Sequence, residues 1–71
     1  MNNLRENISN NLLRLMNQGA LNQREMAARC ELTPAALSQL INKQRTPSLE
    51  TVIKICDKFS ASIDWLIGRK P

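Results

Sequence analysis

Helix-start signals recur along this chain, and they constrain its fold more than any other feature. Asn3 and Asn22 are each followed three residues later by a glutamate, which is the pattern of a capping box. Thr33 is a capping residue followed by proline, and Ser48 and Ser62 each precede an apolar segment. No segment alternates between apolar and polar residues as a half-buried strand does. The sequence therefore predicts an all-α fold of five short helices.

Apolar residues recur at helical spacing behind each start signal. The first helix has such a stripe and is expected to end at Gly19. We predict the five helices over residues 3–19, 22–30, 33–42, 48–59 and 62–68. In the fourth helix, the predicted apolar stripe consists of Leu49, Val52, Ile53, Cys56 and Phe59.

Length and composition limit what such a bundle does. The 71 residues suffice for one domain, which we place over residues 1–71. The formal net charge of +4 suits a polyanionic partner. The chain has no histidine, and Cys30 and Cys56 do not form a CxxC pair. We therefore expect buried, reduced thiols and neither a metal site nor a cofactor. No segment resembles a signal peptide or a membrane span, so a cytoplasmic protein is expected.

Residues 23–40, QREMAARCELTPAALSQL, have the pattern of a helix-turn-helix. Such a motif needs a small residue where its two helices cross closely, and Ala27 stands at that position. The turn between the helices is short, over residues 31–33. Apolar residues at the spacings that set the angle between the helices are Met26, Cys30, Leu32, Leu37 and Leu40. We place the motif at about residues 23–42.

The motif and three further segments resemble the Cro and phage-repressor (XRE-like) family of helix-turn-helix regulators. ISNNLLRLM is similar to the family's first helix, RTPSLETVIKIC to its fourth, and SIDWLIG to its closing segment. The resemblance implies a lambda-repressor-like domain that binds double-stranded DNA specifically and regulates transcription, with repression as the expected effect. The family usually has glycine at the positions of Glu31 and Lys43, so we expect a positive φ there. A side chain in that conformation costs about 1 kcal/mol.

The resemblance implies that the third helix enters the major groove and contacts base edges. Gln39 is the preferred reader, because its amide is able to pair with adenine N6 and N7 together. Ala35 and Ala36 offer methyl groups to thymine, or alternatively serve only to form the helix. The predicted base contacts are Thr33, Ala35, Ala36, Ser38, Gln39 and Asn42.

Phosphate contacts are expected from the flanks of the third helix, because that helix carries no charge. Gln23 matches the family glutamine that contacts phosphate, and Lys43 and Arg45 follow the third helix. Arg24 and Arg29 are further candidates, although each is equally explained as a solvated surface charge. The predicted phosphate contacts are Gln23, Arg24, Arg29, Lys43 and Arg45.

The last predicted helix, which we take as the dimerisation helix at about residues 62–67, holds more apolar residues than one inward face is able to bury. Trp65 either completes the monomer core or contacts a second copy. We expect a homodimer that presents two recognition helices to a near-palindromic operator. The predicted interface consists of Ile63, Trp65, Leu66 and Ile67.

Other functions fit the sequence less well. The chain has no histidine, no glycine-rich phosphate loop and no paired carboxylates, so neither an enzyme nor a small-molecule ligand is expected. An antitoxin, an activator or a protein-binding adaptor on the same fold is the alternative to a repressor. Selection of bound DNA from a random pool would distinguish the adaptor from a DNA-binding regulator.

Overall fold

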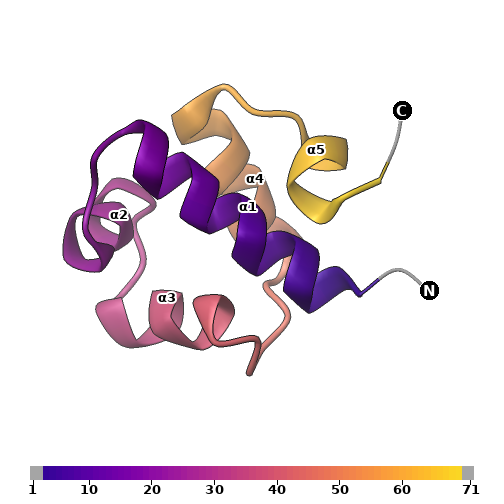
Figure 1. Cartoon of the computed structure of the whole chain (residues 1–71), viewed down its shortest axis with the longest axis horizontal. Helices are drawn as coiled ribbons and strands as arrows, with labels where there is room; N and C mark the ends of the chain where they lie inside the picture. The colour runs from indigo at the N-terminus through magenta and orange to yellow at the C-terminus, as the bar shows by residue number, and fades with distance from the viewer. Residues whose placement is uncertain (1–2, 70–71) are drawn as a thin grey trace.

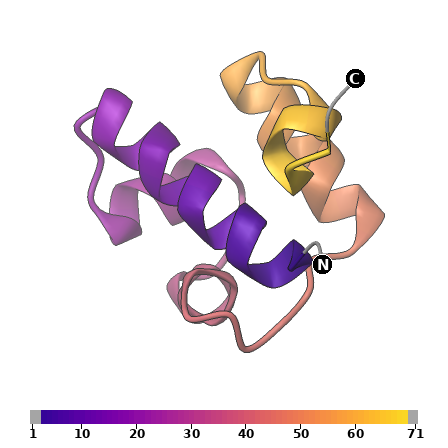
Figure 2. The same ribbon diagram turned by 45° about the vertical axis from the view of Figure 1, so that its right-hand side comes forward.

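Five helices make up the computed structural model, which describes residues 3–69. They are α1 (Leu4–Gln18), α2 (Gln23–Arg29), α3 (Pro34–Ile41), α4 (Leu49–Phe59) and α5 (Ile63–Ile67) (Figures 1 and 2). Within this range there is no strand, and no helix combines the length and apolar character needed to cross a membrane. The predicted all-α, five-helix architecture is confirmed.

Each helix begins at the capping residue that the sequence predicts. In every case the cap side chain accepts a hydrogen bond from the backbone N–H three residues later, which satisfies one donor that the helix leaves unpaired. The five caps are Asn3, Asn22, Thr33, Ser48 and Ser62. At α2 the Glu25 carboxylate also accepts from the Asn22 N–H at 3.0 Å, which completes the capping box.

A residue with a left-handed backbone conformation (positive φ) lies at the end of each helix, and most of these residues are not glycine. At the end of α1 the Leu21 N–H returns to the Met16 carbonyl at 2.8 Å, the pattern of a Schellman motif. The Leu32 and Gln44 N–H groups do the same at the ends of α2 and α3. The positive φ values predicted at Glu31 and Lys43 are confirmed, at 59° and 62°. Further residues with positive φ are Ala20, Ser60 and Gly68.

Gly19 and Gly68 have different roles at their helix ends. Gly19 ends α1 as predicted, but its φ is −89° and the next residue, Ala20, takes the left-handed conformation. Gly68 has φ 81° at the end of α5, and a Cβ there would collide with the side chain of Asn7. Only at Gly68, therefore, do both backbone conformation and neighbouring atoms require glycine.

The core packs against the buried side of α1, which crosses the middle of the molecule between α3 and α5 (Figure 1). Its Ser9 hydroxyl donates to the Ile41 carbonyl at 2.5 Å, and Asn11 Nδ2 donates to the Trp65 carbonyl at 2.7 Å. These bonds join α1 to the ends of α3 and α5. The fully buried apolar side chains come from every helix: Ile8, Leu12, Met26, Leu37, Ile55 and Leu66.

The apolar stripe predicted for α4 is partly wrong. Leu49 and Ile53 are 69% and 42% exposed, whereas Ile55, which the prediction omits, is fully buried. The buried face is made by Val52, Ile55 and Cys56. Leu49 is the first residue of the helix, and Ile53 projects about 100° around the helix from Val52, away from Ile55. Two apolar side chains of α4 are therefore left at the surface.

Both cysteines are free and buried, in agreement with the sequence prediction. Burial raises the pKa of the Cys30 thiol, and it also raises the pKa of Cys56. A buried thiol with a raised pKa is a poor nucleophile, because the thiolate is the reactive form.

Candidate nucleic-acid interface

Helices α2 and α3 pack together across a short turn. Ala27 and Met26 of α2 are buried against Leu37 and Leu40 of α3 within a common core. A small side chain at Ala27 allows the two helices to approach closely. Since the buried side of α3 is defined by Leu37 and Leu40, its opposite side is free to meet a partner.

The turn between α2 and α3 is attached to the end of α4. Glu31 has a positive φ of 59°, and its carboxylate lies 3.0 Å from Lys58 Nζ. The hydrogen bond from Lys58 holds the pKa of Glu31 below its ordinary value. Both side chains are largely exposed, so solvent screens this ion pair and it contributes little to stability.

The outward face of α3 carries four of the six predicted base-contact residues. Ala35, Gln39 and Asn42 are exposed, and Ser38 is half-buried beside them. Asn42 Nδ2 donates to Ser38 Oγ at 3.2 Å, so these two side chains are coupled. The face is uncharged and bears amide, hydroxyl and methyl groups, which are the groups that read base edges in the major groove.

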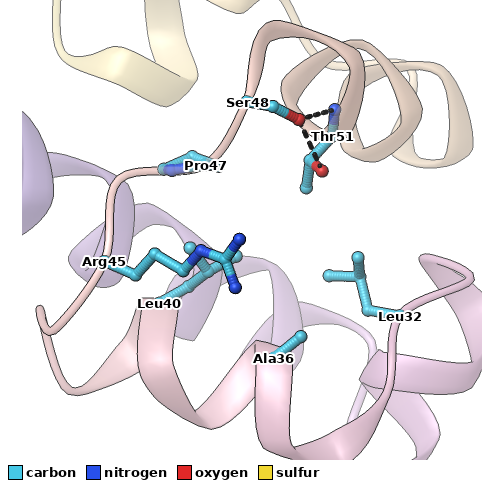
Figure 3. Close-up of a pocket in the computed structure, with 7 residues that line it drawn as sticks. All are labelled: Leu32, Ala36, Leu40, Arg45, Pro47, Ser48 and Thr51. Carbon is cyan, nitrogen blue, oxygen red and sulfur yellow. Dashed lines mark hydrogen bonds between the residues drawn. The ribbon is translucent and has the colours of Figure 1, made fainter.

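Thr33 and Ala36, the other two predicted base contacts, lie differently. Thr33 is exposed at the start of α3, where its Oγ1 accepts from the Ala36 N–H at 3.1 Å. Ala36 is half-buried and lines a hollow of about 160 Å³ between α3 and the start of α4 (Figure 3). We do not retain Ala36 as a base contact, because its side chain is directed toward α4.

Exposed polar and cationic side chains lie on the two elements that precede and follow α3 in the chain. Gln23 and Arg24 are exposed at the start of α2, and Lys43 and Arg45 are exposed in the segment that follows α3. Within residues 3–69 the salt bridge present is the one between Lys58 and Glu31, so no carboxylate there neutralises these cations. Positive charge beside an uncharged reading face suits a helix docked between two phosphate backbones.

Arg5 is a further cation beside the loop that follows α3, although no pattern in the sequence predicts a role for it. Its Nε donates to Thr46 Oγ1 at 3.0 Å, which brings the start of α1 beside the loop between α3 and α4. The two residues are 41 positions apart, and no local pattern indicates such a contact. Only the packing of α1 places this guanidinium beside the loop that carries Lys43 and Arg45.

Arg29 is not part of the interface. Its guanidinium lies over the Phe59 ring, 5.0 Å from the ring centroid, which is a cation–π contact. Phe59 ends α4, and Figures 1 and 2 both place that end of α4 on the opposite side of the molecule from α3. We therefore do not retain the phosphate contact predicted for Arg29.

Helix α5 leaves three of its four apolar residues at least partly accessible. Ile63 is 39% exposed, and Trp65 and Ile67 are half-buried against the core. Leu66 is fully buried and belongs to the core, so it has no surface to offer a second copy. The predicted interface is thereby reduced to Ile63, Trp65 and Ile67.

The described part of the chain gathers no three Cys, Asp or Glu side chains that would hold a metal ion. In comparisons with known proteins, a family model described as helix-turn-helix matches residues 12–66, well over half of the chain. No curated protein and no solved structure matches this chain. The family match extends from the middle of α1 to α5 and includes the whole of the α2–α3 pair.

Proposed function

We propose that this chain, which belongs to the helix-turn-helix family of Cro and phage-repressor type, is a dimeric repressor. Members of that family are DNA-binding transcriptional regulators and not enzymes. In this proposal α3 lies in the major groove of a near-palindromic operator, and repression follows from occupation of that site. Each subunit reads one half-site.

One observation carries the proposal: an uncharged polar face of α3 lies between cations that have no acidic partner within residues 3–69. Gln39 is exposed on this face, and Asn42 is exposed at its C-terminal end. Arg24, Lys43 and Arg45 flank it and would contact phosphates. Phosphate contacts set the position of the helix, and side-chain amides then discriminate among bases.

The location of α5 supports a two-fold dimer. In Figure 1, α5 lies at one side of the molecule and α3 along its lower edge. A two-fold axis that passes beside α5, vertical in that view, would leave both copies of α3 on one face. The chain is 31 Å along its longest axis, comparable with the roughly 34 Å that separates successive major-groove sites.

Exposed apolar side chains on α5 and on the helix that packs against it would give this dimer its driving force. Ile63 contributes from α5, and Leu49 and Ile53 contribute from α4, which packs against α5. Apolar area removed from water stabilises a complex by about 25 cal/mol per Å² before the entropy of association is subtracted. A second copy of the same surface is the simplest partner in a closed two-fold arrangement.

Selection of bound duplexes from a random pool tests DNA recognition. We expect enrichment of a near-palindrome, and a plot of log affinity against log salt with a slope of about −5, if each subunit neutralises about three phosphates. Equal affinity for all sequences would contradict the repressor and favour a protein-binding adaptor.

A charge placed on α5 tests the dimer. Ile63→Glu should yield a monomer in sedimentation and lose cooperative binding to the palindrome, with unchanged helical content. Leu13→Glu is the matched control, because Leu13 is 44% exposed on α1, on the opposite side of that helix from Asn11 and α5. If both variants remain as dimeric as the wild type, or if the wild type is itself a monomer, the dimer is refuted.

A further inference from the structure

We infer that Arg45 acts as a positioning residue for base recognition, by holding the Gln39 amide, besides any contact that it makes with phosphate. This inference rests on the proposed function. The sequence assigned Gln39 to base reading and Arg45 to phosphate binding as separate tasks. The structure joins them, because Arg45 Nη1 donates a hydrogen bond to Gln39 Oε1 at 3.4 Å.

The end of α3 brings the two side chains together. Lys43 has φ 62°, and the Gln44 N–H donates to the Gln39 carbonyl at 2.9 Å. This left-handed turn reverses the chain, so that Arg45 returns alongside the last turn of α3. Gln39 is therefore bonded to the following loop by both its backbone and its side chain.

The Arg45 side chain is directed along α3 and not away from it. Figure 3 shows its guanidinium extending over α3 between Leu40 and Ala36, across the hollow that these residues line. Within residues 3–69 no carboxylate lies within ion-pair distance of it. Gln39 Oε1 is thus the acceptor that this guanidinium uses in the free protein.

This bond determines what Gln39 presents to the groove. A side-chain amide has one oxygen acceptor and an NH₂ group with two donors. With one lone pair of Oε1 engaged by a cationic donor, the Nε2 donors are the groups left fully free to meet a base. The amide then favours a base edge that offers acceptors, such as guanine N7 and O6, over one that must also donate. Without Arg45 the Gln39 amide rotates freely. Adenine, which accepts at N7 and donates from N6, then competes equally with guanine.

The experiment measures affinity for operators that carry each of the four base pairs at the position read by Gln39. In the wild type we expect a guanine preference at that position. Arg45→Met removes the guanidinium but keeps an unbranched stem over the hollow. It should lower overall affinity and reduce the ratio of guanine to adenine affinities by about two- to tenfold, the range for one hydrogen bond.

Two further variants separate positioning from charge. Lys43→Met removes a cation from the same loop without touching Gln39, so it should weaken all four operators by the same factor. In a Gln39→Ala background, Arg45→Met should likewise change affinity but not the base ratio. Circular dichroism of each variant establishes that the helices are intact.

The outcomes distinguish this inference from the proposed function. If Arg45→Met leaves the guanine preference of the wild type unchanged, the inference alone is overturned. The same holds if Arg45→Met changes the ratio of guanine to adenine affinities equally in the wild type and in the Gln39→Ala background. A wild type that binds every sequence equally overturns the proposed function, and the inference with it.

Discussion

Ala20 is an alanine in a conformation that favours glycine, and its replacement should stabilise the protein. It is exposed, has φ 53°, and follows the cap of α1 in a Schellman motif. A left-handed conformation costs an L-residue about 1–2 kcal/mol. Glycine avoids this strain but loses about 0.4–1 kcal/mol through the greater freedom of its unfolded chain. We therefore expect Ala20→Gly to raise the free energy of unfolding by about 0.5–1 kcal/mol.

The matched control is the same substitution in a right-handed helix. Ala28 is exposed within α2, where glycine is less favourable than alanine by roughly 0.8–1 kcal/mol. Ala28→Gly should therefore destabilise the protein while Ala20→Gly stabilises it. The two variants have the same composition, so their difference isolates the backbone conformation of the site.

Thermal and urea unfolding followed by circular dichroism measure both effects. For a domain of this size, 1 kcal/mol shifts Tm by about 4–8 °C, so Ala20→Gly should raise Tm by about 2–8 °C and Ala28→Gly should lower it. If Ala20→Gly destabilises the protein as much as Ala28→Gly does, then strain at the end of α1 does not exist and the reasoning is wrong.

Three other predictions follow from the same structure. Lys43→Gly should stabilise the fold by about as much as Ala20→Gly does, yet weaken binding to all DNA sequences. Titrations at several salt concentrations should show a slope of log affinity against log salt that is shallower by about one unit per subunit. Cys30 should resist alkylation at pH 8 until the protein unfolds, because it is fully buried and burial raises its pKa. Lys58 lowers the pKa of Glu31 in the folded protein. The stabilisation from this pair is therefore complete above the pKa that Glu31 has in the unfolded chain, and it is lost as pH falls through the pKa that Glu31 has in the folded protein. Urea midpoints between roughly pH 5 and 3 should decline more steeply for the wild type than for Glu31→Gln.

Which residues start and end the helices is decided locally, and the sequence was sufficient to predict them. A cap such as Thr33 or Ser48 reaches a backbone N–H only three residues away, so its effect does not depend on the rest of the fold. The turns at Glu31 and Lys43 were expected from the family resemblance, and their positive φ values are confirmed. The same local logic predicted the end of α1 at Gly19, which is confirmed, but it did not indicate that Ala20 takes the left-handed conformation.

Tertiary structure decided which side chains meet. Helical periodicity does not distinguish Ile53 from Ile55, since the buried face of α4 depends on where α5 and the rest of the core lie against it. Likewise, the sequence offered both Arg29 and Arg45 as phosphate contacts, with Arg29 equally explained as a surface charge. Packing placed Arg29 over Phe59 and Arg45 beside Gln39. Arg5 reaches Thr46 from 41 residues away. A long side chain takes whichever partner the fold brings within about 3–4 Å, and that distance is set by the packing of whole helices, which no local pattern encodes.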